Sequence, residues 1–129
     1  MKFSVGYKSS AGEDFLNAVI KNKEHIEEVY FSWGSFPNGR APDTACGTLT
    51  EWEAYKKMTD DLCRLNGEGL KFNLLFNGNC YGRESLAQSF YNKIGDTVDY
   101  ILNSFNLSSV TTTSPLIAKF IKTNFPSLK

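Results

Sequence analysis

The chain has 129 residues, 41% of them hydrophobic, and its 14 basic side chains balance its 14 acidic ones. A chain of this length suits one domain with a sizeable core, and the balanced, scattered charge gives no nucleic-acid signature and no field that would attract an acidic membrane. No segment approaches the roughly 18 apolar residues of a transmembrane helix, and no secretory signal follows Met1-Lys2. Three cysteines favour free thiols in a reducing compartment, so we expect a cytoplasmic protein.

Two strand–helix units are predicted in the first half of the chain. Residues 3–7 alternate apolar and small side chains, and an apolar stripe from 15 to 20 predicts a helix that opens at Gly12. Residues 28–33 predict the second strand because they are rich in aromatic and β-branched side chains. The irregular segment 34–47 follows, and loops of that length are often functional. It ends at a capping box of Thr48 and Glu51, which starts a helix that runs to Asn66-Gly67.

Two further units are predicted in the second half. Residues 70–76 form a nearly continuous hydrophobic run, which is typical of a strand covered on both faces. A turn at 77–82 leads to two short helices, at about 83–93 and 97–105, with Asp96 capping the second. Residues 107–113 predict the fourth strand, and Ser114-Pro115 starts a helix that ends at Phe125-Pro126.

The alternation of strands and helices predicts the fold class. The order βαβαβαβα favours an α/β fold with a parallel sheet and right-handed crossovers. The last residues, 127–129, resemble the first residues of a fifth strand. We therefore expect 1–129 to be a single α/β domain of four consecutive βα units. It would form half of a TIM-type barrel, as the amino-terminal segment of a longer (βα)8 barrel.

Candidate ligand-binding residues gather where the predicted strands end. In α/β folds, ligands bind beyond the carboxyl ends of the strands. Arg40 lies in the long loop and Arg83 follows the 77–82 turn, and an arginine at either place suits a carboxylate or phosphate. Asn77, Asn79 and Thr113 add polar groups on the same rim. A loop-ordering bond is an equal alternative for Arg40, and β-propensity also explains the threonine.

Two cysteines fall on the same predicted rim. Cys46 and Cys80 are candidate ligands for zinc or an iron–sulfur cluster, or candidate nucleophiles. Their spacing matches no CxxC motif, and simple packing is the alternative that we favour. Cys63, within the second helix, is expected to be buried. His25, the sole histidine, is expected on the surface of the opposite rim, which argues against a Ser–His–Asp or Cys–His mechanism.

Three segments carry a family resemblance. The first strand, the Val29-Tyr30-Phe31 strand with its Gly39-Arg40 loop, and the Asn79-Cys80-Tyr81-Gly82 turn resemble the amino-terminal half of the collagenase-like peptidases of unclassified mechanism. That family includes accessory proteins of oxygen-independent ubiquinone hydroxylation and of tRNA or ribosomal RNA hydroxylation. Its members are similar to TIM barrels. The resemblance implies a peptidase-like hydrolase or a hydroxylation-accessory role, and it identifies no catalytic residue.

The resemblance also bears on cofactors and partners. Several family members carry a four-cysteine iron–sulfur cluster, so a cluster is expected only in a full-length parent. Cys46 could correspond to the first cluster cysteine, the other cluster cysteines come later than residue 129, and Cys80 matches none of them. The expected partner is the remainder of a longer chain or a second copy. The alternative function is a stand-alone α/β binding or interaction module that self-associates to hide its sheet edges.

Overall fold

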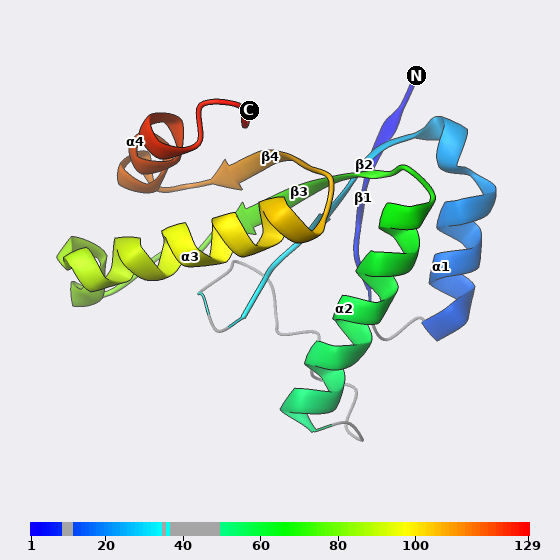
Figure 1. Ribbon diagram of the computed structural model, residues 1–129, viewed down its shortest axis with the longest axis horizontal. Helices are drawn as coiled ribbons and strands as arrows, with labels where there is room; N and C mark the ends of the chain where they lie inside the picture. The colour runs from blue at the N-terminus through cyan, green and yellow to red at the C-terminus, as the bar shows by residue number, and fades with distance from the viewer. Residues whose placement is uncertain (9–11, 35, 37–49) are drawn as a thin grey trace.

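The computed structural model describes residues 1–8, 12–34, 36 and 50–129, which form four strand–helix units (Figure 1). The strands are β1 (Phe3–Gly6), β2 (Ile26–Phe31), β3 (Lys71–Phe76) and β4 (Leu107–Thr112). The helices are α1 (Gly12–Lys21), α2 (Glu51–Gly67), α3 (Gln88–Ser104) and α4 (Pro115–Asn124), with short 3-10 helices η2 (Lys23–His25) and η4 (Arg83–Leu86). The predicted α/β class and the order of the four units are confirmed. Among the described residues, no helix is long and apolar enough to cross a bilayer.

The strands form one parallel sheet in the order β1-β2-β3-β4. The register places Val29 beside Phe72, and Asn73 beside both Tyr30 and Ser109. Side chains at paired positions share a face and successive residues alternate between faces. The register shifts once between β1 and β2, where Glu27 has no partner, and once between β3 and β4. The sheet therefore has two chemically distinct faces.

All four helices pack on the same face of the sheet. Their buried apolar side chains form one core cluster with strand residues that include Val29, Phe72 and Leu74. Leu75 is buried but stands outside that cluster, because it alternates onto the opposite face. In Figure 1 the helices surround the strands from α1, beside β1, to α4, beside β4. The second face of the sheet thus has no helical cover among the described residues.

The start of α2 differs from the prediction. The helix begins at Glu51 with Thr50 as its N-cap, and the capping box is formed by Thr50 and Glu53. The Thr50 hydroxyl oxygen accepts the Glu53 N–H at 3.2 Å, and the Glu53 carboxylate accepts the Thr50 N–H at 2.7 Å. The bond from the Thr50 N–H, and second a bond from the Thr50 hydroxyl to the same carboxylate at 2.7 Å, lower the pKa of Glu53. The sequence contains two Thr-x-x-Glu boxes two residues apart, and the prediction chose the earlier one.

The second half of the chain holds one long helix where two short ones were predicted. After η4, α3 runs from Gln88 to Ser104 without a break at Asp96, so the predicted cap there is wrong. Gly95 lies within this helix. In the structure it lies against α4, where a Cβ would be 3.3 Å from the ring of Phe120. The glycine serves close helix packing instead of ending a helix.

Three smaller predictions have separate outcomes. Strand β2 covers Ile26–Phe31 and not 28–33, so Trp33 follows the strand. Cys63 is exposed on α2, because the buried stripe of that helix passes through Leu62 and Leu65. The predicted exposure of His25 is confirmed.

The last residue pairs with the outer edge of the sheet. The Lys129 N–H donates to the Ser108 carbonyl at 3.2 Å, and the Lys129 carbonyl accepts the Val110 N–H at 3.0 Å. This exchange around one residue is the pattern of a parallel ladder. Residues 127–129 were predicted to begin a fifth strand, and Lys129 occupies the position that such a strand would take beside β4.

Candidate functional site

The turn after β3 is closed by its own side chains. The Tyr81 hydroxyl accepts the Gly78 N–H at 2.9 Å and donates to the Phe76 carbonyl. The Thr113 hydroxyl, a predicted ligand group, donates to the Gly78 carbonyl at 2.9 Å. Its one proton is therefore used to join the carboxyl ends of β3 and β4.

The other predicted rim residues that the structure describes differ in their surroundings. Asn79, Cys80 and Arg83 are exposed, and the Cys80 sulfur accepts the Gly82 N–H at 3.3 Å. The Asn77 side-chain oxygen is buried and has no hydrogen-bond partner within the described part of the chain.

Of the two predicted metal ligands, the structure describes only Cys80. Arg40 and Cys46 lie outside the described residues. Within the residues that the structure describes, no three His, Cys, Asp or Glu side chains are grouped as metal ligands would be. Cys63 and Cys80 lie on different elements and are both exposed. The described residues therefore do not form a site that fits an iron–sulfur cluster.

A polar network occupies the face of the sheet without helical cover. The Glu28 carboxylate on β2 lies at its centre and accepts hydrogen bonds from side chains of all three other strands. Ser4 donates to Oε1 at 3.2 Å, Asn73 donates to Oε1 at 2.9 Å, and Ser109 donates to Oε2 at 2.9 Å. Thr111 then donates to the Asn73 oxygen at 3.0 Å. We call these five residues the Glu28 network.

The Glu28 network shows that this face is concave. Because one carboxylate bridges them, the Ser4 and Ser109 hydroxyl oxygens lie within about 8 Å of one another. Three strand spacings of a flat sheet would separate β1 from β4 by roughly 14 Å. The sheet must therefore curl toward the Glu28 network and away from the helices.

Tyr30 covers the β1 side of the concave face. Its ring lies so close to Gly6 that a Cβ on that glycine would be 2.8 Å from a ring carbon. A side chain larger than hydrogen at position 6 would therefore push the ring aside. Glycine at this position lets Tyr30 close over the strand edge beside Glu28.

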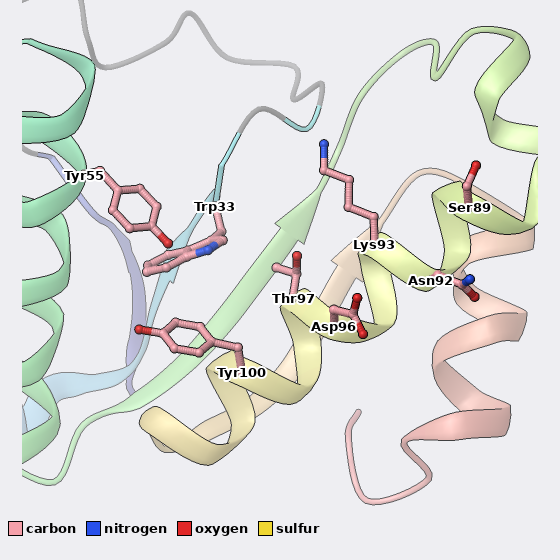
Figure 2. A pocket seen from close by; sticks show the side chains of 8 residues that line it. All are labelled: Trp33, Tyr55, Ser89, Asn92, Lys93, Asp96, Thr97 and Tyr100. Carbon is pink, nitrogen blue, oxygen red and sulfur yellow. The ribbon is translucent and has the colours of Figure 1, made fainter.

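A second feature lies on the helical side, between α2 and α3. An open cleft of about 460 Å³ is lined by aromatic and polar side chains (Figure 2). The Trp33 ring lies 4.7 Å from the ring of Tyr55 and 5.8 Å from that of Tyr100, measured between centroids. Burial raises the pKa of Tyr55, the neighbouring Tyr100 adds to the rise, and a hydrogen bond from Trp33 offsets part of it. The cleft offers aromatic stacking, and it is separate from the Glu28 network.

A buried acid on α2 is paired with two side chains. Asp61 Oδ2 accepts the Tyr7 hydroxyl at 2.7 Å and the Lys57 ammonium at 2.6 Å. These contacts join the end of β1 to α2. Removing Lys57 would leave the buried Asp61 charge without its ion-pair partner.

The Glu28 network was not predicted from the sequence. Glu28 was predicted as the first residue of a strand, and Asn73 as one residue of a nearly continuous hydrophobic run. One signal in the sequence could have revealed the network. Polar residues occupy alternate positions of strands in which apolar residues are expected. Glu28, Asn73 and Ser109 all follow that pattern, and the register then places them together.

Comparison of the chain with protein-family models, curated proteins and solved structures found no match.

Proposed function

We propose that the chain is the amino-terminal half of a TIM-type barrel related to the collagenase-like peptidases, and that the concave face becomes the barrel interior. The observation that carries the proposal is the carboxylate of Glu28, which bridges β1 and β4 and so requires a curled sheet. Sequential strand order and helices on one face also favour a barrel. The pairing of Lys129 with β4 supports it further, because the sheet accepts a parallel neighbour on that edge.

In the closed barrel the Glu28 network lines a polar chamber for a peptide substrate of a hydrolase. Barrel interiors are usually filled by branched apolar side chains. A row of serine, threonine, asparagine and glutamate side chains departs from that rule, and the departure supports binding of a polar ligand. Since the described cysteines do not form a cluster site, the proposal assigns no step to an iron–sulfur cluster.

A second function is favoured by the exposed β1 edge. Phe3 on that edge strand is 53% exposed, and an unpaired edge with an apolar side chain is prone to association. The alternative is therefore a stand-alone binding module whose concave face and β1 edge are covered by a second copy.

The test measures the oligomeric size of the chain and its peptide hydrolysis in the same fractions. The chain is separated by gel filtration over a range of concentrations, and each fraction is assayed for hydrolysis of a fluorogenic peptide library. The barrel-half proposal predicts hydrolysis in the associated fraction, where the concave face is covered, with loss of activity in E28Q but not in E27Q. Association without hydrolysis supports the binding module and contradicts the hydrolase. A well-folded strict monomer at all concentrations contradicts the self-associating module.

A further inference from the structure

The hydroxyl hydrogens of the Glu28 network all go to other members of the network, and Asn73 gives one of its two amide hydrogens to Glu28. Ser4 and Ser109 each have one hydroxyl proton and give it to Glu28, and Thr111 gives its proton to Asn73. The remaining capacity of these three hydroxyl oxygens is to accept. A carboxylate has about four acceptor positions. Two are used on Glu28 Oε1 and one on Oε2, so one position on Oε2 is open.

The charge of Glu28 is not compensated by an ion pair. The ion pairs of the described residues join Lys23 to Glu68, Lys57 to Asp61 and Arg64 to Glu13, and none includes Glu28. Neutral donors stabilise a carboxylate without cancelling its charge. Closing a barrel around it would make an unpaired carboxylate costly, because buried charges need a partner of opposite sign. Lys71, at the β3 position paired with Glu28, lies on the same face but is exposed and belongs to none of these ion pairs. The Glu28 carboxylate therefore has no salt bridge among the described residues and can accept a cation.

Hydrogen-bond capacity decides which cation fits. A guanidinium binds a carboxylate best as a two-pronged fork, and Glu28 Oε1 already accepts two hydrogen bonds. A divalent metal prefers several charged oxygen ligands, whereas Glu28 is the one carboxylate of its network. A primary ammonium has three donors and no acceptor. It can use the open Oε2 position together with the hydroxyl oxygens of Ser109 and Thr111.

In a closed barrel entered at the carboxyl ends of its strands, the depth of Glu28 limits how the ammonium is carried. Glu28 lies three residues before Phe31, the end of β2, which is roughly 10 Å of strand. A branched or bulky carrier would meet Tyr30 and Leu75, which lie on the same face further along their strands. We propose that the concave face binds a primary ammonium on an unbranched alkyl chain, as at the end of a lysine side chain, with Glu28 as its anchor. A lysine-containing peptide as the natural carrier rests on the proposed function, while the ammonium site itself rests on the Glu28 network.

The test is a titration of the full chain followed by amide NMR. The probe is Nα-acetyl-lysine N-methylamide, which has an ε-ammonium and no free α-amino group. We expect saturable shifts at Ser4, Asn73 and Ser109, and an affinity at least tenfold lower in E28Q. Glu27 is the matched control, because it is exposed at the register shift, and E27Q should bind as the unchanged chain does. T111V removes one acceptor without touching Glu28 and should weaken binding about threefold, which keeps the test valid if E28Q unfolds.

Two further probes test the assignment of the cation. Alanine N-methylamide presents only an α-ammonium, and Nα-acetyl-arginine N-methylamide only a guanidinium. Equal binding of either one, saturation by Mg²⁺ in place of the lysine probe, or unchanged binding in E28Q and T111V would overturn the proposal. Binding without peptide hydrolysis would leave the ammonium site standing and contradict the proposed function. Hydrolysis that is lost in E28Q, without binding of the lysine probe, would support the proposed function and contradict the ammonium site.

Discussion

Replacing Glu28 by alanine removes the acceptor of three hydrogen bonds at once. The loss of stability depends on whether each donor is left buried without a partner or in contact with water. Asn73 is 8% exposed, and an unpaired buried N–H costs about 1–3 kcal/mol. Ser109 is half-buried and loses a bond to a charged acceptor, which adds about 1 kcal/mol. Ser4 is exposed, so water replaces its partner. We expect E28A to lower the free energy of unfolding by about 2–4 kcal/mol.

Urea unfolding followed by circular dichroism measures this change. E27A is the control, because its side chain is exposed at the register shift, and it should stay within about 0.5 kcal/mol of the unchanged chain. A double-mutant cycle of E28A and S109A should show a coupling energy of about 1 kcal/mol between the two side chains. If E28A were no more destabilising than E27A, the carboxylate would not hold the four strands together, and the reasoning that leads to a curled sheet would fail.

Two other predictions concern local packing and capping. G6A should destabilise the fold by about 1–3 kcal/mol, because its Cβ would lie 2.8 Å from the Tyr30 ring. The control is G67A, whose Cβ would meet no atom within 4 Å and which should change urea stability by less than about 1 kcal/mol. An equal loss of stability in both variants would contradict the close contact between Gly6 and Tyr30. T50A should cost about 0.5–2 kcal/mol in thermal or urea unfolding through loss of the N-cap. Because the pKa of Glu53 is lowered from 4.5 in the folded chain, its capping contribution is present above that value and is lost as the pH falls through the folded pKa. E53Q should flatten this acid dependence of stability, and an unchanged profile would show that the cap does not titrate.

Strand and helix order could be predicted from the sequence because each element has a strong local signal. A nearly continuous hydrophobic run marked β3, and apolar periodicity marked α4. Ser114-Pro115 marked the start of α4 with both a cap and an N1 proline. Boundaries were less secure where two local signals compete. The two Thr-x-x-Glu boxes before α2 are an example. Asp96 is another case, because its cap-forming side chain indicated a helix start where α3 runs on without a break.

The Glu28 network could not be predicted because it depends on register and curvature. Nothing near Glu28 in sequence indicates that Ser109, 81 residues later, donates to its carboxylate. Ligand-binding residues were predicted in the loops after the strands, by the general rule for α/β folds. The structure uses Thr113 and Tyr81 there to close a turn, and it gathers polar side chains on the concave face of the strands.

The central claim is that the sheet curls around Glu28, and side-chain proximity in solution tests it most directly. In a chain with selectively labelled glutamate and serine, the account predicts nuclear Overhauser contacts from the Glu28 methylene protons to the β-protons of both Ser4 and Ser109. In a flat sheet, Glu28 could reach its neighbour β1 but not β4, which lies two strand spacings away. A contact to Ser4 without one to Ser109 would contradict the curled sheet, and with it the proposed barrel half.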